Sequence, residues 1–241
     1  IEQREPIALL FDRMYSLRQQ AAQNAGFANF RDYVFPAKFR FDYTPEDCER
    51  FHRAVGRFVA PAAERVLEYR LRQLQVDVLR PWDLQVDPYQ KAALRPFRSM
   101  PEFTSRAAHV FDRVDPALGG EFRVMLDERL VDLDSRKGKA PGGYCDTLHY
   151  RGRPFIFMNA VGVVDDVMTL MHESGHAFHA FAAHAQPLIW QRHPGLEAAE
   201  LASMSMELLA APHLSSTGGY FTEGGARSAS LDHLEDVLLS L

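Results

Sequence analysis

Two histidines four residues apart, His172 and His176, stand inside a long apolar run that contains no proline before Pro187. On a helix, residues at this spacing project from one face, so their imidazoles can close on a single metal ion. Glu173 directly follows the first histidine, an offset that puts its carboxylate beside a metal-activated water without making it a ligand. The H-E-x-x-H spacing therefore predicts a helix with two zinc ligands, His172 and His176, and a general base, Glu173.

A catalytic zinc site takes three protein ligands and leaves one position open, so a third donor is expected on another element. The predicted helix at residues 197–209 offers Glu197, Glu200 and Glu207. Glu200 and Glu207 are seven residues apart and share a helical face, and Glu197 could share it too. We choose Glu200 as the third ligand and Glu207 as an acceptor that orients a ligand histidine, although spacing alone does not exclude Glu197.

Other polar side chains are expected around this centre. His179 lies on nearly the same helical face, but it is too far along a straight helix to join the ligands of His172. We therefore expect it in packing, in substrate contact or in the second shell. Donors to a developing oxyanion could come from four aromatic or histidine side chains, each of which is more often structural: Tyr144, His149, Tyr150 and Tyr220.

Apolar spacing predicts a mainly α-helical chain with a small β-sheet beside the active-site helix. Helices are expected at residues 7–26, 44–59, 61–74, 197–209 and 226–239, and one from Asp165 or Asp166 that ends before Pro187. Short helical stretches are expected between Met100 and Val114. Thr44 should cap the second of these, with Pro45 in its first position. Gly119 and Gly120 predict a turn, and the runs FRVMLDERLVDLD and RPFIFMNAV are expected to be extended. We expect a helical part at residues 1–118 and a zinc-binding catalytic core at 119–241, within one continuous domain.

Composition excludes several classes of protein. With 27 Lys+Arg against 32 Asp+Glu the net charge is -5, so no general basic field favours nucleic acid. Two cysteines without a C-x-x-C pair leave nitrogen and oxygen as metal donors and favour a reducing compartment, the cytoplasm. No apolar run reaches the ~18 residues of a membrane span, so no membrane partner is expected. The start at Ile1 and the end inside LEDVLLSL predict a piece cut from a longer chain, and the oligomeric state cannot be inferred.

The stretches GKAPGGYC, LMHESGHAFHAF and AAELASMSMELL resemble the M3 peptidase family, in particular its oligoendopeptidase F branch, whose relatives include thimet oligopeptidase. In that family H-E-x-G-H-x-x-H supplies two zinc histidines and the base, matched here by His172, His176 and Glu173. The glutamate of a later E-x-x-S pattern is the third ligand, matched by Glu200. FRFDYTPEDCERFH and RPWDL extend the resemblance over most of the chain.

The resemblance implies a zincin-like metalloendopeptidase with one Zn²⁺ per chain, in which a deep channel admits short unfolded peptides. It also implies a His and Tyr pair at the oxyanion, from a segment beyond the end of this chain. We further expect Gly142, Gly143 and Tyr144 to present backbone groups to an extended substrate, against the alternative of a plain turn before a strand.

Two rival functions remain open at this point. The chain could be a non-catalytic zinc-binding fragment or a degenerate peptidase that acts as a scaffold. Glu173 argues against this, because a structural site usually closes with a fourth protein ligand and needs no base. The chain could instead be a helical interaction protein without metal, which a zinc content near zero would favour.

Overall fold

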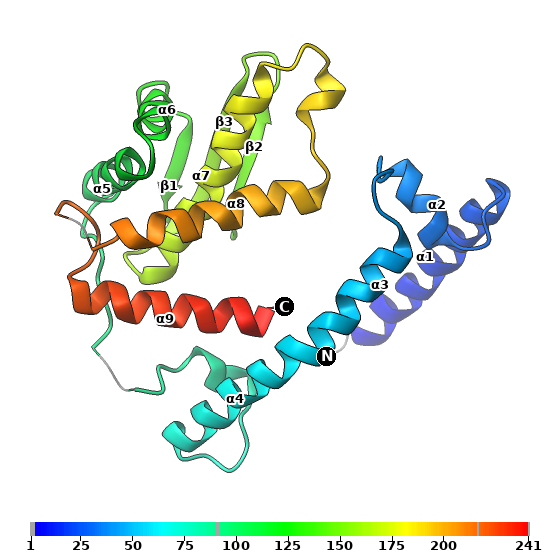
Figure 1. Cartoon of the computed structure of the whole chain (residues 1–241), viewed down its shortest axis with the longest axis horizontal. Coiled ribbons are helices and arrows are strands. Elements are labelled where there is room, and N and C mark those ends of the chain that lie inside the picture. Colours follow the sequence, from blue (N-terminus) through cyan, green and yellow to red (C-terminus); the bar gives the residue numbers. More distant parts are fainter. Residues whose placement is uncertain (1–2, 90–91, 216, 241) are drawn as a thin grey trace. The chain divides into compact units, whose positions relative to one another are not determined.

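A computed structural model describes residues 3–89, 92–215 and 217–240. The chain is mostly helical with one small sheet, as predicted (Figure 1). It divides into two compact units, residues 1–65 and 66–240, which are described separately below. The expected division at residues 118/119 stays a prediction. No helix of the described residues is both long and apolar enough to cross a membrane.

The first unit contains three helices, α1 (Arg4–Asn24), α2 (Phe30–Ala37) and α3 (Pro45–Ala54). A π-helical turn at Val55–Val59 leads into α4 (Ala60–Leu74), which crosses into the second unit. The Thr44 side chain accepts the Asp47 N–H, and Asp47 in return accepts the Thr44 N–H, so the predicted cap of α3 is confirmed. The helices predicted at residues 7–26 and 61–74 are confirmed to within three residues at their ends. The helix predicted at residues 44–59 is α3 together with the π-helical turn that continues it.

The second unit begins its core with α5 (Met100–Val114) and α6 (Pro116–Asp127). The turn predicted at Gly119–Gly120 is wrong, because both glycines lie inside α6. Asp115 accepts the Ala117 N–H and starts this helix, with a proline in its first position. Gly119 lets α6 approach α5 closely, since a Cβ there would clash with Asp112. Residues 121–127 are therefore helical, and only the end of the run predicted as extended forms a strand.

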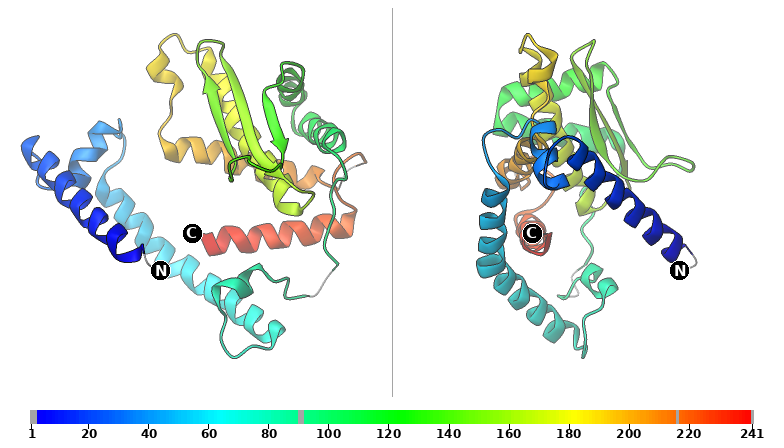
Figure 2. Two further views of the ribbon diagram at one scale, coloured as in Figure 1. Left: turned by 180° about the vertical axis from the view of Figure 1, so that it is seen from behind. Right: turned by 90° about the vertical axis from the view of Figure 1, so that its right-hand side faces the viewer.

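The sheet has three strands, β1 (Val131–Asp134), β2 (Tyr144–Leu148) and β3 (Arg153–Ala160), in the order β1-β3-β2. β1 runs parallel to β3 and β2 antiparallel to it, with Cys145 opposite Ile156. Alternate residues of β3 are buried, as the predicted strand requires. The sheet packs along α7 (Val164–His184), and β2 is an edge strand of the sheet (Figure 2).

The N-cap of α7 is Val163, so the prediction that Asp165 or Asp166 caps this helix is wrong, because both lie in its first turn. Asp166 instead holds the N-terminus of the helix from its third position. Its Oδ2 accepts the backbone N–H groups of Val161, Gly162 and Val163 at 2.7–2.9 Å. α8 (Leu196–Ala210) packs against α7, and α9 (Glu223–Ser240) follows. The predicted helices in these three places are confirmed. Short 3₁₀ turns occupy Pro81–Gln85, Ile189–Arg192 and Ala211–His213.

The core of the second unit lies between α5, α6, α7 and the sheet. Its largest fully buried side chains include Phe103, Phe111, Phe122, Met125, Ile156, Leu170 and Met171. α7 and α8 touch at Gly175, where an added Cβ would lie 2.6 Å from Ser203 Cα. This close approach brings the side chains of α8 within reach of the histidines on α7.

Candidate functional site

Three potential metal donors converge where α7 and α8 face each other. The Nε2 atoms of His172 and His176 lie 3.4 and 3.7 Å from Glu200 Oε2, and the donor atoms of the three residues all lie within 4.8 Å of one another. Donors on a tetrahedral zinc ion, with bonds of about 2.0–2.1 Å, are about 3.3–3.4 Å apart. The two imidazoles and the carboxylate therefore fit one ion with the chemistry of a His/His/Glu donor set.

The three carboxylates of α8 occupy different places. Glu200 points to the histidines, and the buried Ser203 hydroxyl holds it by donating to its Oε2 at 3.1 Å and to its backbone oxygen at 2.9 Å. Glu197 lies in the first turn of α8, where its Oε2 is close to Gly195. The structure thus brings Glu200, and not Glu197, to the two histidines.

Glu207 lies behind the first histidine. Its Oε1 is 2.6 Å from His172 Nδ1, which leaves Nε2 of that ring directed toward Glu200. Burial raises the pKa of Glu207, but the hydrogen bond from His172 and the close contact with His233 outweigh it and lower that pKa to about 2. The hydrogen bond to Glu207 raises the pKa of His172, against the effect of burial. Glu207 is accordingly an ionised acceptor.

His233, on α9, is a member of this site that the sequence analysis missed. Its Nε2 lies 3.1 Å from the second oxygen of Glu207, Oε2. No short-range spacing relates His233 to the histidine motif, since its position depends on how α9 packs against α8. Its only sequence signal is a histidine on a predicted helix.

Glu173 is buried beside the donors, with 7% of the residue exposed. The backbone N–H of Cys145, at the start of β2, donates a hydrogen bond to its carboxylate. Burial raises the pKa of Glu173, and the charge of Glu200 adds to this, while His172 opposes it. A carboxylate with a raised pKa at the wall of a pocket is suited to accept a proton near neutral pH.

The segment Gly142–Tyr144 lies next to Glu173. A Cβ at Gly143 would be 3.6 Å from Glu173 Oε1, and Gly142 has a φ of +99° that suits glycine. The Tyr144 ring is half exposed and stacks on Phe157 of β3, with centroids 5.0 Å apart. The structure thus sets this segment beside Glu173 and at the start of the edge strand.

Two anchors hold the loop that carries this segment. The Asn159 side-chain amide donates to the backbone oxygens of Ala140 and Gly142 at 2.9 and 3.0 Å. Lys139, with a side chain that is 1% exposed, donates to the backbone oxygens of Asp134 and Met158 and to the Asp132 carboxylate. The loop is therefore tied to β1 and β3.

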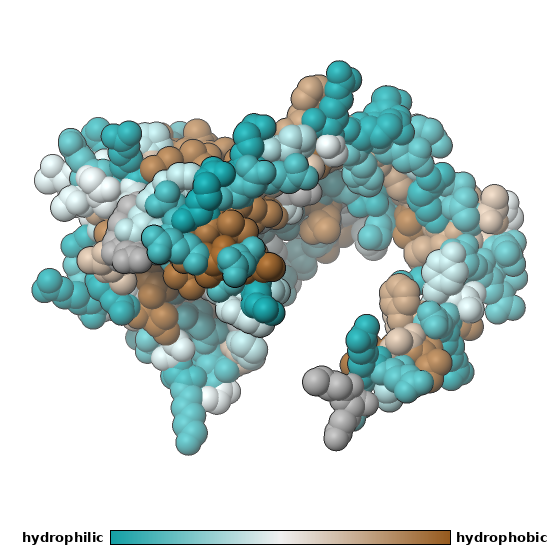
Figure 3. Space-filling view, turned by 90° about the horizontal axis from the view of Figure 1, so that it is seen from below, coloured by the Kyte–Doolittle hydropathy of each residue, from teal (hydrophilic) through white to brown (hydrophobic). Residues whose placement is uncertain are grey.

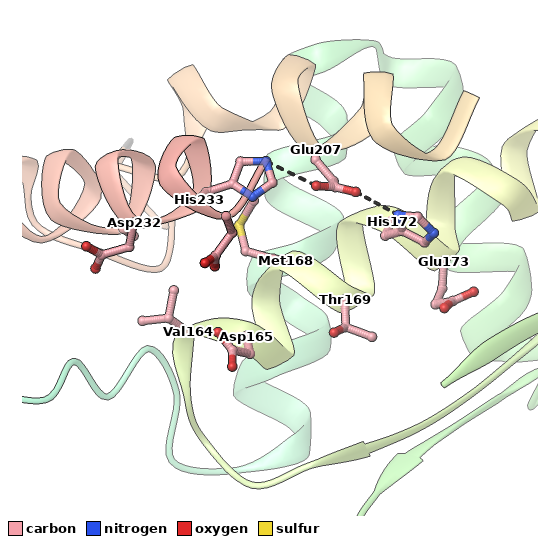
Figure 4. A pocket seen from close by; sticks show the side chains of 11 residues that line it. Val164, Asp165, Met168, Thr169, His172, Glu173, Glu207, Asp232 and His233 are labelled. Atoms are coloured by element: carbon pink, nitrogen blue, oxygen red, sulfur yellow. Dashed lines mark hydrogen bonds and ion pairs between the residues drawn. The ribbon is translucent and has the colours of Figure 1, made fainter. Parts of the chain in front are cut away.

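Pockets open on both sides of the donor set. One, of about 430 Å³, is lined by His172, Glu173, Thr169 and residues of α9 (Figure 4). The other, of about 330 Å³, is lined by His176, Glu200 and residues of β2. A chain lying across the donors would have room on either side.

The remaining predicted residues are spread around these pockets. His179 and His149 line the second pocket. The pKa of His176, in the same pocket, is lowered first by burial, then by the charge of His172, and further by His179. Tyr150 is fully exposed in the turn after β2. Tyr220 is buried, and its hydroxyl donates a hydrogen bond to the backbone oxygen of Phe103 at 2.6 Å, so this residue is part of the hydrophobic core.

Comparison with known proteins gives consistent matches. The model of peptidase family M3 matches residues 2–220. Oligoendopeptidase F (chromosomal) of Lactococcus lactis subsp. cremoris is 27% identical over 149 residues, and oligopeptidase PepF of Bacillus subtilis is 28% identical over 159 residues. These alignments cover 61% and 64% of the chain.

Solved structures agree with the sequence matches. PZ peptidase A, solved with an inhibitor, superposes with a TM-score of 0.88 at 30% identity over 100% of the chain. An oligoendopeptidase F structure from Bacillus anthracis superposes with a TM-score of 0.86 at 27% identity over 99% of it. The matches span 24% and 22% of the Lactococcus and Bacillus subtilis proteins and 42% of PZ peptidase A.

Proposed function

Because this chain belongs to peptidase family M3, we propose that it carries the zinc centre of an endopeptidase that hydrolyses internal bonds of short peptides. His172, His176 and Glu200 would hold one Zn²⁺. The observation that carries the proposal is the convergence of these donors, with Glu173 buried beside them. The names of the relatives, oligoendopeptidase F and oligopeptidase, support the substrate class.

Zinc at such a site lowers the pKa of water and polarises the scissile carbonyl. Glu173 accepts the proton that the attacking water loses as its oxygen bonds to the carbonyl carbon. It then delivers that proton to the nitrogen when the C–N bond breaks, so that an acid and an amine leave. The raised pKa of Glu173 makes its carboxylate a stronger base for accepting the proton of the water than an exposed carboxylate would be.

The chain's own residues also prepare the site for a peptide. Glu207 fixes the ring of His172, and Ser203 fixes Glu200. Gly142, Gly143 and Tyr144 would offer backbone groups to an extended substrate at the edge of the sheet, and glycine leaves space for that approach. The two pockets would take residues on either side of the cleaved bond. His179, in the second pocket, would contact substrate or support His176.

The proposal includes a cytoplasmic location, for which the small number of cysteines, both free in the structure, is the supporting observation. An endopeptidase confined to short unfolded peptides is compatible with that compartment.

The test compares the unchanged chain with the Glu173→Gln variant. We expect one zinc per chain in both, measured by mass spectrometry of the metal, and a ~10²- to 10⁴-fold lower kcat for Glu173→Gln on a quenched fluorescent octapeptide. Glu64→Gln, which changes an exposed glutamate of α4, is the matched control and should cleave normally. One zinc with no cleavage by either chain would support a zinc-binding fragment that acts as a scaffold. Equal cleavage by both would remove Glu173 from the mechanism.

A further inference from the structure

The carboxylate of Glu207 is shared between two histidines from different helices. Oε1 contacts His172 Nδ1 on α7 at 2.6 Å, and Oε2 contacts His233 Nε2 on α9 at 3.1 Å. Figure 4 shows Glu207 between the two rings. The side chains of Glu207 and His233 are each only 12% exposed, so water has little access to the contact. Both oxygens of the carboxylate therefore have a protein partner.

A carboxylate held at one oxygen alone can still turn about its last side-chain bond. The contact at Oε2 removes that freedom, so the plane of the carboxylate and the direction of the His172 ring are fixed together. The His233 contact deviates from the direction of a straight hydrogen bond. The contact is therefore an electrostatic attraction between a ring N–H of His233 and the charge of the Glu207 carboxylate.

On one side His233 lines the pocket of about 430 Å³, which is also lined by Asp232 and Asp236. The residue also lines a cavity of about 130 Å³ whose other lining residues are apolar except for Ser230. Its Nε2 is buried and has no hydrogen bond of good geometry within the described part of the chain. A leucine or phenylalanine would fill the apolar cavity as well, so packing there does not by itself account for a histidine.

We propose that His233 is a positioning residue of the metal centre, which holds Glu207 and, through it, the ring of His172. This inference rests on the proposed function, because it takes His172 to be a zinc ligand. α9 thereby becomes part of the site, although it supplies no donor. Loss of His233 should weaken zinc binding by allowing Glu207 to turn.

The variants His233→Phe and His233→Gln test this proposal. Phenylalanine keeps a ring and removes the N–H, whereas the glutamine amide nitrogen can take the place of Nε2. We expect the zinc Kd, measured by competition with a chelating dye, to rise ~10- to 100-fold for His233→Phe and to recover most of that loss in His233→Gln. Arg227→Gln, which changes an exposed arginine of the same helix, is the control and should leave the zinc Kd unchanged.

Two further measurements separate positioning from general stability. Thermal unfolding of the zinc-free proteins should give similar Tm values for the two His233 variants, so that a difference in Kd between them reports on the site. In a Glu207→Gln background, His233→Phe should raise the Kd by less than twofold, because its effect passes through Glu207.

The outcomes distinguish this inference from the proposed function. A zinc Kd for His233→Phe within twofold of the unchanged chain would overturn the positioning role, even if zinc is bound and peptide is cleaved. A full effect of His233→Phe in the Glu207→Gln background would overturn the route through Glu207. If the unchanged chain bound no zinc, both this inference and the proposed function would fall.

Discussion

The helix α1 of the first unit and the helix α7 of the second are equally long but lie in different environments. In α1, Leu9, Leu10 and Leu17 are each more than half exposed, and apolar side chains are visible at the surface of the molecule (Figure 3). In α7 nine residues are buried, among them Leu170 and Met171. Apolar spacing therefore specifies a helix without specifying how deeply it is buried. The burial depends on close neighbours, which α7 has in the sheet and in α8.

The largest expected effect comes from truncating a leucine in each region. Leu170→Ala should lower the free energy of unfolding by about 3 kcal/mol, because it leaves a cavity in a filled core. Leu10→Ala should change it by less than about 0.5 kcal/mol, since that side chain is 60% exposed. Urea denaturation followed by circular dichroism measures both. Equal losses would show that the two regions do not differ in burial.

Adding a methyl group tests the same difference in packing, because it needs free space instead of leaving a cavity. Gly175→Ala should destabilise the chain by about 2–3 kcal/mol, because its Cβ would meet the backbone of α8 at Ser203 and Ala202. Gly56 lies in a helical turn, and a Cβ added there would meet no other atom. Gly56→Ala should therefore stabilise the folded chain by roughly 0.5–1 kcal/mol. Thermal unfolding gives both values, and a neutral Gly175→Ala would mean that α7 and α8 can move apart freely.

Ion pairs differ between the two regions as well. Lys139→Met should lower stability by about 2 kcal/mol, since it removes a buried ammonium group that binds the Asp132 carboxylate and the backbone oxygens of Asp134 and Met158. Arg31→Met should lower it much less than Lys139→Met does, because Arg31 is 47% exposed where it pairs with Glu49 and water screens the pair. Urea midpoints of the two variants provide the test, and similar losses would contradict it.

The smallest expected effect is the pH dependence of the Lys139 contribution. Hydrogen bonds from Arg136 and then Lys139 lower the pKa of Asp132 to about 2, against the opposing effect of burial. This stabilisation is present above the unfolded pKa near 3.9 and is lost as pH falls through about 2. The stability gap between the unchanged chain and Lys139→Met should therefore narrow between pH 5 and pH 2. A gap that stays constant over this range would show that the ionised Asp132 does not contribute.

The parts of the site that follow local periodicity were predictable. The spacing of His172 and His176 requires only that α7 be a helix, and the choice of Glu200 over Glu197 needed the family resemblance as well. The Gly119–Gly120 turn was mispredicted because glycine lowers helix propensity, whereas the packing of α6 on α5 requires it there. His233 could not be found from the sequence, because its contact depends on the packing of α9 rather than on spacing. Roles in metal binding and catalysis stay predictions for the experiments above.

The contacts of Asp166 have a consequence for insertions and deletions. Asp166, six residues before His172, holds the start of α7 by accepting hydrogen bonds from three consecutive backbone N–H groups. One residue inserted between the two would rotate the rest of the helix by about 100° and turn both imidazoles away from Glu200. The same insertion beside the fully exposed Tyr150 would only lengthen the turn between β2 and β3. Natural length variation in related chains should therefore occur in that turn and be absent between Asp166 and the first histidine.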